Sequence, residues 1–338
     1  MLKQPKQLIN PWMVAPMMGW TTRHYRYFLR LISKKVQLYT EMITTAAILH
    51  SPYRDRLLGY HLLEQPLAIQ LGGSVPAELA QAAKIAEAYG YSEINLNVGC
   101  PSDRVQSGCF GAILFKDIHL VAECIAEMQA AVRLPITVKT RIGVDNCESY
   151  DYLASFIQKV SEAGCNTFII HARKAWLLGL SPKENREIPP LNPAWVYQIK
   201  RDFSHLTIVI NGGIKSLTEA TAHLQHVDGV MIGRAAWYTP YLFRALDVLP
   251  SESQSHDTYE SVKDKIAIVQ DYIPYAQTAF SKGENISHLL QPLFGLFHGV
   301  AGAGQWRMAL TQAIQRKEAP DIALQKSLGF CPKREVFL

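Results

Sequence analysis

Eight short apolar segments alternate with amphipathic segments over about 240 residues, and this alternation leaves the chain few possible folds. The apolar segments are rich in Val, Ile and Leu without clean polar alternation, which is typical of strands buried on both faces. Strands are expected at Trp12–Met17, Val36–Glu41, Leu67–Leu71, Glu93–Asn97, Ile136–Thr140, Thr167–His171, Leu206–Ile210 and Gly229–Ile232. The pattern predicts an α/β protein whose strands close into a (β/α)8 TIM barrel.

Helical periodicity fills the intervals between these strands and continues to the end of the chain. Barrel helices are expected at Arg23–Ser33, Pro76–Tyr89, Ile118–Ala131, Ser149–Ala163, Pro193–Arg201, Leu217–His223 and Trp237–Leu246. The polar, Ser-rich stretch Pro250–His256 is typical of a linker. Beyond it, helices are expected at Val262–Tyr275, His288–Phe297, Gln305–Gln315 and Asp321–Leu328. The predicted domains are a TIM barrel at 1–249 and an all-helical domain at 257–330.

Local signals support several of these helix ends. Ser216 and Glu219 have the spacing of an N-terminal capping box at the start of the predicted helix Leu217–His223. Gly90 and Gly164 follow predicted helices at the position where a left-handed residue ends a helix.

Composition excludes several classes of protein. With 338 residues, 48% hydrophobic and 19% charged, the chain resembles an ordinary globular enzyme. No signal peptide and no apolar run of about 20 residues is present. The six cysteines are scattered without a C-x-x-C pair, so neither a disulfide framework nor a metal site is expected. We therefore expect a reduced, cytoplasmic protein.

The charge is distributed unevenly along the chain. The net charge is only +5, yet no acidic residue precedes Glu41. Arg23, Arg26 and Arg30 recur at spacings of three and four, which places them on one helix face. This face is either an anion-binding surface that helps to hold RNA or a solvated helix face, and the sequence leaves both readings open.

One cysteine lies where a buried strand is expected to end. The segment Ile94–Pro101 reads Ile-Asn-Leu-Asn-Val-Gly-Cys-Pro, so Cys100 comes directly after the strand and faces a pocket. A thiol there could serve as a nucleophile or as a proton donor, since its pKa lies near the useful range at neutral pH. Cys109, in the same loop, is the alternative donor, although we expect Cys109, Cys124, Cys147 and Cys165 to be inert buried thiols.

Glycines after the last two strands predict a phosphate site. Asn211, Gly212 and Gly213 follow the seventh strand, and Gly233 and Arg234 follow the eighth. Loops at these two strand ends form the recurrent phosphate site of TIM barrels, because backbone N–H groups and a helix N-terminus favour an anion. The alternative is that these glycines only form turns.

Three further polar residues end other strands of the predicted barrel. Lys139 could form a Schiff base, supply positive charge to an anionic cofactor, or take part in a structural ion pair. Gln70 and His171, taken singly, are more often satisfied polar residues. Together the three form a ring of donors that suits the edge of a flavin.

These residues occur within longer motifs that resemble one family. The chain is similar to the bacterial tRNA-dihydrouridine synthases, and among them to the A subfamily, which acts on D-loop positions 20 and 20a. The similarity extends in order over nearly the whole chain. It rests on Ala15–Met17, Tyr39–Met42, Asn95–Gln106, Phe110–Ala112, Val138–Gly143, His171–Arg173, Asn185–Leu191 and Asn211–Gly213.

The resemblance implies FMN as the bound cofactor and NADPH as the reductant. It implies that reduced FMN gives a hydride to C6 of a uracil ring and that Cys100 protonates C5. It also implies that the uridine leaves its stack to reach the barrel mouth. The FMN-binding residues that it implies are Ala15, Pro16, Met17, Gln70, Lys139, His171, Asn211, Gly212, Gly213, Gly233 and Arg234.

The resemblance implies a second set of residues that contact tRNA. Asn97 touches the target nucleotide, while Lys183, Arg186 and Arg307 contact the rest of the tRNA. The helical tail departs from the family pattern: Gly304 and Met308 stand where arginines are usual. Both positions belong to the implied tRNA-binding segment, and the loss of two cations is expected to weaken RNA affinity and its salt dependence.

Three other readings explain fewer of these features. A Schiff-base aldolase or isomerase would use Lys139 and the phosphate site but leaves Cys100 unexplained. A non-catalytic RNA-binding barrel predicts eroded cofactor residues, whereas Gln70, Lys139 and His171 are all present. A flavin barrel that acts on a free pyrimidine would not need the helical tail. We expect a monomer, since a large RNA must have access to the protein surface.

Overall fold

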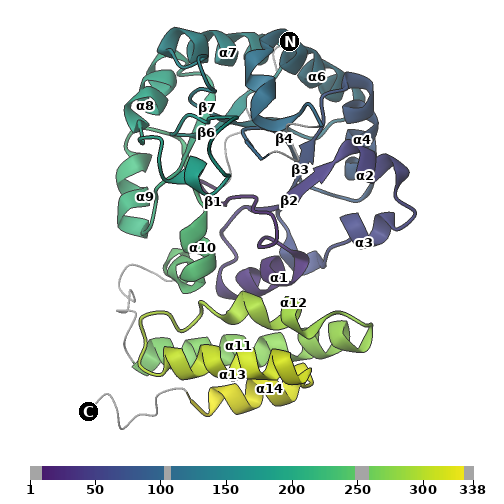
Figure 1. Cartoon of the computed structure of the whole chain (residues 1–338), viewed down its shortest axis with the longest axis vertical. Coiled ribbons are helices and arrows are strands. Elements are labelled where there is room, and N and C mark those ends of the chain that lie inside the picture. The colour runs from purple at the N-terminus through teal and green to yellow at the C-terminus, as the bar shows by residue number, and fades with distance from the viewer. Residues whose placement is uncertain (1–9, 103–107, 248–258, 331–338) are drawn as a thin grey trace. The chain divides into compact units, whose positions relative to one another are not determined.

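The structure, a computed structural model, describes residues 10–102, 108–247 and 259–330 (Figure 1). They form two compact units. The first contains the residues up to Gly19 together with Gln37–Gly233, and the second contains Trp20–Val36 together with the residues from Arg234 onward. None of the helices in these ranges is long and apolar enough to cross a membrane.

The first unit contains the predicted barrel. Eight parallel strands are hydrogen-bonded in the order β1-β8-β7-β6-β5-β4-β3-β2. The strands are β1 Trp12–Val14, β2 Leu38–Thr44, β3 Leu67–Gly72, β4 Glu93–Val98, β5 Ile136–Arg141, β6 Thr167–His171, β7 Thr207–Asn211 and β8 Gly229–Ile232. All eight predicted strands are present, although the first ends at Val14, three residues earlier than expected. The second extends further than expected, past a register shift between Tyr39 and Met42.

The two edge strands meet and close the sheet. Met13 of β1 bridges Gln37, directly before β2, in parallel orientation. The backbone N–H of Val14 donates to the Gln37 carbonyl at 3.0 Å, and the N–H of Gln37 donates to the Trp12 carbonyl at 2.9 Å. The strands therefore form a TIM-barrel-like ring, and all their carboxyl ends open on one mouth.

The register of β4 determines which side chains enter the barrel. Asn95 lies beside Gln70 of β3 and Thr137 of β5, so its side chain faces inward, while Ile94 and Leu96 are buried on the outer face. The apolar part of the interior is a separate cluster formed by Met13, Ala15, Tyr39, Ala68, Ile169, Val209 and Met231. The barrel interior is thus polar around β4 and apolar around β1 and β8.

Helices surround the strands of the first unit (Figure 1). The principal ones are α4 Pro76–Ala88, α6 Ile118–Ala131, α7 Tyr150–Glu162, α8 Pro193–Asp202 and α9 Leu217–Leu224. Shorter pieces are α2 Thr45–His50, α3 Arg54–Leu58 and the 3₁₀-helices η1 Leu62–Glu64, η2 Gly111–Lys116 and η3 Glu184–Arg186. Gly90 and Gly164 have φ angles of +84° and +107°, which confirms the predicted left-handed positions after α4 and α7.

The start of α9 differs in detail from the predicted capping box. The Ser216 hydroxyl accepts the Glu219 N–H at 3.1 Å, as predicted. The Glu219 carboxylate instead accepts the N–H of Lys215 at 2.7 Å, one residue earlier than a capping box requires. Both bonds still satisfy backbone donors near the helix start.

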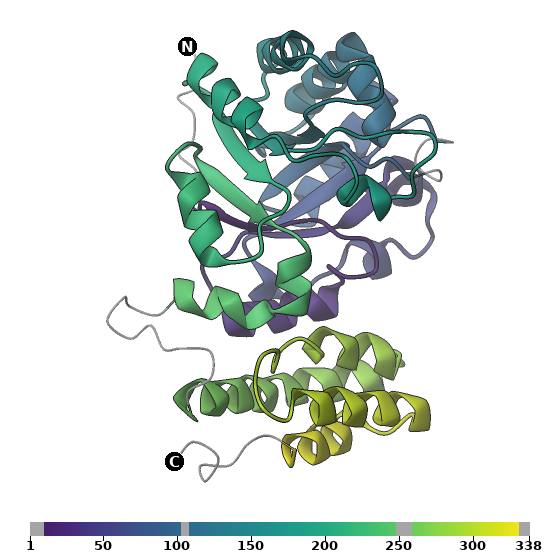
Figure 2. The ribbon, with the colours of Figure 1, turned by 60° about the vertical axis from the view of Figure 1, so that its left-hand side comes forward.

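The second unit is helical. It contains α1 Arg23–Ile32, α10 Arg234–Tyr238, η4 Pro240–Leu246, α11 Tyr259–Ser281, α12 Ile286–Leu290, η6 Gln291–Leu293, α13 Ala303–Arg316 and α14 Pro320–Leu328. Helices α11 to α14 lie side by side in both views (Figures 1 and 2). Trp306 of α13 is buried and donates its indole N–H to the Leu293 carbonyl at 3.0 Å.

Two predicted helices are interrupted by proline. The expected helix Trp237–Leu246 is split into α10 and η4, because Pro240 has no N–H to continue the α-helical bonding. The expected helix His288–Phe297 likewise becomes α12 followed by η6, with Pro292 at the start of the 3₁₀ segment. The predicted linker Pro250–His256 lies outside the described residues.

The proposed basic face on α1 is wrong. Arg26 and Arg30 are buried, not presented to solvent. A guanidinium nitrogen of Arg26 donates to the Thr21 carbonyl at 2.7 Å, and one of Arg30 donates to the Lys34 carbonyl at 3.0 Å. The spacing of three and four was correct for one helix face, but Arg26 and Arg30 on that face are buried and donate to backbone carbonyls near the ends of α1.

Candidate active site

The predicted site residues gather at the mouth of the barrel. Gln70, Asn97, Lys139, His171 and Asn211 lie at or near the carboxyl ends of β3, β4, β5, β6 and β7. Neighbouring strands are in register, since Asn97 pairs with Lys139 and His171 pairs with Asn211. Because the strands are parallel, these side chains share one opening.

Cys100 lies two residues beyond the end of β4. Its backbone N–H and that of Gly99 both donate to the side-chain oxygen of Asn97, each at 3.0 Å. Its carbonyl accepts the Ala112 N–H at 2.9 Å, and its half-buried thiol lies 3.5 Å from the Ser102 hydroxyl. The backbone N–H and the carbonyl of Cys100 are therefore both hydrogen-bonded, which fixes the backbone that carries the thiol.

The other thiols differ in their surroundings. Cys124 and Cys165 are buried, and burial raises the pKa of each to about 12, as expected of inert thiols. The prediction was wrong for Cys109, which is exposed with a φ angle of +54°, and for Cys147, which is half-buried. The short polar loops that carry these two residues do not place them in a core. Cys331 lies outside the described residues, as do 103–107 of the motif around Cys100.

Lys139 is a half-buried cation in the barrel mouth. Its ammonium donates to the Asn211 side-chain oxygen at 3.0 Å. Burial, followed by repulsion from Arg141, lowers the pKa of Lys139 to about 7. The amine is therefore partly neutral near pH 7, and an anion in the mouth would favour its charged form.

His171 lies among cations. Burial, followed by the charges of Arg141, Lys139, Arg173 and Arg186, holds its pKa well below the usual range. The imidazole is therefore neutral near pH 7 and presents one N–H donor and one acceptor.

Arg141 links two loops of the mouth and was not among the predicted site residues. Its guanidinium donates to the carbonyls of Gly99 at 2.9 Å and of Lys174 and Asn185 at 3.0 Å. These partners are backbone carbonyls, which carry no charge, so they do not neutralise the positive charge of Arg141 beside Cys100. The sequence signal was its position two residues after Lys139, which puts both side chains on the same face of β5.

The glycines after β7 form a narrow turn. Gly212 and Gly213 have φ angles of +108° and +78°. A Cβ on Gly212 would lie 2.4 Å from the His171 ring, and a Cβ on Gly213 would lie 2.4 Å from Leu191. Only glycine allows this backbone to approach the neighbouring side chains so closely.

A cavity of about 270 Å³ opens beside this turn. It is lined by Gly212, Gly213, Ile214 and Lys215 and by Ala172, Leu191, Pro193, Glu219 and His223. Gly233 lies directly after β8, and a Cβ there would meet only Ala15, at 3.8 Å. Arg234 follows as the first residue of α10. The side chain of Asn211 is already bonded to Lys139 and to the Met231 carbonyl, so backbone groups of the glycines are better placed to meet a ligand.

The remaining predicted FMN-binding residues, Ala15, Pro16 and Met17, directly follow β1. Ala15 is buried directly after β1, and its backbone N–H donates to the Ile232 carbonyl at 2.9 Å. Pro16 and Met17 follow it and are partly exposed, with Met17 packed against the interior cluster.

Asn185 organises the long loop after β6. It is fully buried; its side-chain oxygen accepts the Trp176 N–H at 2.8 Å, and its amide donates to the carbonyls of Trp176 and Leu180. Lys183 is exposed on this loop, whereas Arg186 is half-buried. In the helical unit, Gly304, Arg307 and Met308 are exposed on α13. The structure thus brings Lys183 and Arg186 onto one loop and the other three onto one helix.

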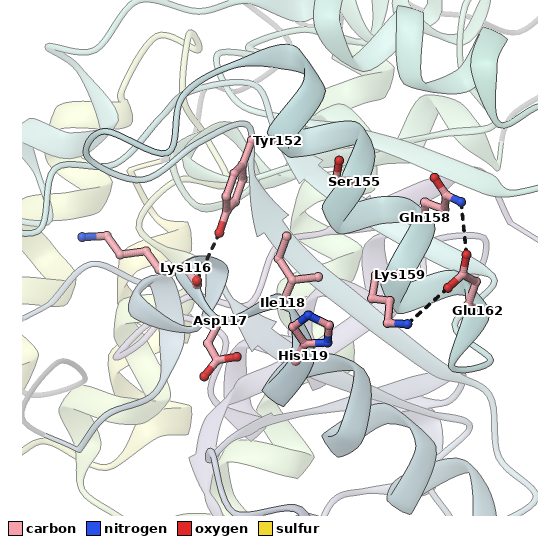
Figure 3. Close-up of a pocket in the computed structure, with 9 residues that line it drawn as sticks. All are labelled: Lys116, Asp117, Ile118, His119, Tyr152, Ser155, Gln158, Lys159 and Glu162. Atoms are coloured by element: carbon pink, nitrogen blue, oxygen red, sulfur yellow. Dashed lines mark hydrogen bonds and ion pairs between the residues drawn. The ribbon is translucent and has the colours of Figure 1, made fainter.

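A larger cavity, of about 440 Å³, lies on the outside of the barrel (Figure 3). It is bounded by residues 116–119 at the start of α6 and by Tyr152, Ser155, Gln158, Lys159 and Glu162 of α7. Two of its charged side chains, Lys159 and Glu162, pair with each other at 3.5 Å, and Lys116 pairs with Asp145 outside the cavity lining. It contains none of the strand-end residues, so the candidate site remains the barrel mouth.

The sequence matches the family described as Dihydrouridine synthase (Dus) over residues 13–330. A curated relative from Shigella flexneri named tRNA-dihydrouridine(20/20a) synthase is 54% identical over 316 residues, which cover 93% of this chain and 91% of that protein. A relative of the same name from Vibrio cholerae serotype O1 is 51% identical over 324 residues, covering 96% of this chain and 97% of that protein.

Solved structures share the barrel at low sequence identity. Morphinone reductase in complex with tetrahydroNAD has a TM-score of 0.51 and 12% identity, covering 72% of this chain and 89% of that chain. An old yellow enzyme homologue from Zymomonas mobilis has a TM-score of 0.52 and 13% identity, covering 75% of this chain and 92% of that chain. These likenesses concern the fold.

Proposed function

Because the chain belongs to the dihydrouridine synthase family, we propose that it reduces uridine to 5,6-dihydrouridine in the D-loop of tRNA, at positions 20 and 20a. It is an FMN-dependent oxidoreductase that uses NAD(P)H, and NADPH is the proposed reductant. The observation that carries the proposal is the placement of Cys100 beside the cationic end of β5, where Arg141 donates to the carbonyl of the preceding residue, Gly99. An acid and a ring of donors at one barrel mouth suit reduction of a flat heterocycle.

The chemistry of the mouth fits FMN. An anionic cofactor requires positive charge, which Lys139 and Arg141 supply, and close backbone approach, which Gly212 and Gly213 allow. In the proposed arrangement, Gln70, Lys139 and His171 hold the ring, and Ala15, Pro16 and Met17 lie along it. Its phosphate is held by the segments Asn211–Gly213 and Gly233–Arg234.

Bound FMN, once reduced, supplies the hydride that the uracil C6 accepts. The protein's own part is to hold the uracil and to deliver one proton to C5. We propose that the Cys100 Sγ delivers this proton from a loop that is anchored on Asn97 and lies beside the guanidinium of Arg141. The proposed catalytic residue is therefore Cys100, and Asn97 touches the nucleotide.

Because tRNA is a large substrate, we propose that the two domains have different roles. We assign the chemistry to the barrel domain, 1–249, and tRNA binding to the helical domain, 257–330, with contacts from Lys183, Arg186, Gly304 and Arg307. We further propose a cytoplasmic monomer, since tRNA must reach both the barrel mouth and the α13 surface.

The decisive experiment measures dihydrouridine at tRNA positions 20 and 20a in cells that lack every native enzyme of this kind. Expression of this chain is expected to restore the modified base at those positions. Restoration at another position would change the substrate assignment. A soluble, yellow protein that restores none would favour a small pyrimidine as the substrate.

Lys139 predicts a pH-dependent affinity for FMN. Its pKa is about 7 in the free protein, and an adjacent anion raises it, so binding takes up a proton above pH 7. The dissociation constant is expected to rise by up to about tenfold per pH unit between pH 7 and 9. Fluorescence titration of the FMN-free protein measures this slope.

The matched variants are Lys139→Met and Lys116→Met. The first is expected to bind FMN more weakly at pH 7 and to lose the slope. The second removes an exposed lysine that pairs with Asp145 at 2.7 Å, and the slope should persist. A slope that survives Lys139→Met would assign the proton to another group.

Gly304 predicts a gain of tRNA affinity on substitution. A Cβ at this exposed position of α13 meets nothing within 4 Å, so a long side chain fits without rearrangement. Gly304→Arg is expected to tighten tRNA binding and to steepen the slope of log affinity against log salt by about 0.7 to 0.9. Binding measured at several salt concentrations gives the slope.

Gly304→Ala is the matched control, because it makes the same helix-favouring change without the charge. Its slope should equal that of the unmodified protein. Equal slopes for the alanine and arginine variants would show that this part of α13 does not meet the tRNA backbone.

A further inference from the structure

A continuous line of side-chain hydrogen bonds runs inside the barrel from the carboxylate of the half-buried Glu93 to the Cys100 loop. We call it the amide column, and it consists of Glu93, Thr137, Asn95, Gln70 and Asn97. Its members come from three adjacent strands, β3, β4 and β5, whose register places them next to each other. The proposed function used only the upper members, Gln70 and Asn97, and assigned nothing to Glu93.

The lower part of the amide column is anchored on Glu93. One carboxylate oxygen accepts the Thr137 hydroxyl at 2.6 Å and the Tyr39 hydroxyl at 2.9 Å. Since the Thr137 hydroxyl donates its only proton to Glu93, it accepts from the next member, and the Asn95 amide nitrogen donates to it at 2.8 Å. This orients the Asn95 amide with its oxygen toward Gln70.

The upper part is oriented by the backbone. The Asn97 side-chain oxygen accepts the N–H groups of Gly99 and Cys100, so its amide nitrogen faces Gln70 and donates to the Gln70 oxygen at 2.8 Å. The Gln70 nitrogen then donates to the Asn95 oxygen at 2.8 Å. Both ends of the amide column therefore require the same direction of donation.

We propose that Glu93 is a positioning residue, whose acceptor oxygen sets the direction of the amide column and thereby the orientations of Gln70 and Asn97 at the active site. The proposal rests on the proposed function only where it concerns FMN and uridine. The Asn97 orientation holds the Cys100 loop through two backbone N–H groups. The Gln70 orientation leaves the second N–H of its amide nitrogen for the ring of the cofactor.

The setting of Glu93 supports this role. Burial raises the pKa of the carboxyl, while the hydrogen bonds from Thr137 and Tyr39 oppose the rise. Asn95, Gln70 and Thr137 are buried, with at most 2% of each residue exposed. Because buried amides must find partners, a reversed amide at one position would force the next to reverse. At the upper end, a reversed Asn97 would turn its amide hydrogens toward the two backbone N–H groups.

The test compares two substitutions of the same kind on the same strand. Thr137→Val removes the link between Glu93 and Asn95. Thr140→Val is the matched control, since Thr140 is fully buried but belongs to the outer face of β5 and bonds only to backbone carbonyls, at 3.4 Å. In the FMN-bound protein without tRNA, alkylation of Cys100 by a maleimide is followed by peptide mass spectrometry.

Thr137→Val is expected to raise the Cys100 alkylation rate about tenfold and to shift the visible absorption spectrum of bound FMN. Thr140→Val is expected to leave both within twofold of the unmodified protein. Equal effects of the two substitutions would overturn the proposal, because a loss of general packing moves both alike. An unchanged Cys100 rate in Thr137→Val would overturn it as well.

Two substitutions of Glu93 separate the acceptor from the charge. Glu93→Leu removes the acceptor and is expected to reproduce Thr137→Val; where it fails to fold, Thr137→Val carries the test. Glu93→Gln keeps one acceptor oxygen and is expected to hold the alkylation rate within about threefold. A Glu93→Gln rate as high as that of Glu93→Leu would exclude the acceptor role.

The readouts keep this proposal separate from the proposed function. The alkylation rate depends on the Cys100 loop and not on the substrate. If the protein makes no dihydrouridine but Thr137→Val and Thr140→Val differ as expected, the role of the amide column is supported and the proposed substrate is wrong. If the enzyme makes dihydrouridine but the two variants do not differ, the proposed substrate is supported and the role of the amide column is wrong.

Discussion

Substitution of Cys100 by alanine is expected to slow uridine reduction by about 10²- to 10⁴-fold, the usual contribution of a positioned general acid. The thiol would no longer supply the C5 proton, whereas the backbone bonds of residue 100 to Asn97 and Ala112 would persist. FMN binding should therefore stay within about twofold. Single-turnover formation of dihydrouridine with pre-reduced enzyme measures the effect, because it isolates the step that uses the proton.

The matched control for that substitution is Cys109→Ala. Cys109 lies in the same loop region, nine residues on, and is exposed. The control should react at the rate of the unmodified enzyme. A rate loss in Cys109→Ala with full activity in Cys100→Ala would move the donor to Cys109. Full activity in both would place the donor outside this loop.

Gly212→Ala is expected to weaken FMN binding by about 10- to 100-fold and to lower the free energy of unfolding by about 2–4 kcal/mol. The new Cβ would lie 2.4 Å from the His171 ring on a backbone with a φ angle of +108°. The imidazole must move from the position from which it faces the mouth. FMN titration and denaturant unfolding of the FMN-free protein measure the two effects.

Gly179→Ala separates strain from collision. Gly179 has a φ angle of +81°, but a Cβ there meets nothing within 4 Å. Its substitution should cost only the conformational strain, about 1 kcal/mol, with unchanged FMN affinity. If both variants bound FMN equally well, the collision with His171 would be irrelevant to the cofactor.

The sequence predicted the strands well because each is a compact apolar run followed by polar residues or glycine. The site followed from the same signal, since strand ends in a parallel barrel share one mouth. The alternation of polar and apolar residues in the run around Ile94 was not recognised from the sequence. Glu93, Asn95 and Asn97 face inward while Ile94, Leu96 and Val98 face the helices, so a strand that resembles an apolar run contains a polar interior row.

The residues that were missed act through partners distant in the sequence. Arg141 bonds to carbonyls 33 to 44 residues away, and the buried Asn185 shapes its loop through Trp176 and Leu180. The spacing from Lys139 places Arg141 on the inner face of β5, but the partners of Arg141 and Asn185 leave no local pattern, because loop-to-loop bonds depend on the folded barrel. The basic face of α1 failed for the same reason: helical spacing says which side chains share a face but not what that face meets.

The polar interior around β4 also affects how this protein could change over evolutionary time. In the barrel, apolar side chains of the strands' outer faces pack with buried helix residues such as Leu79, Ile125 and Phe156. Much of the apolar packing thus lies outside the strands, whereas the proposed reactive groups lie in the polar part of the interior and at the mouth. Substitutions that improve the outer layer need not disturb the amides and thiol inside, so thermal tolerance and catalytic specificity can adapt independently.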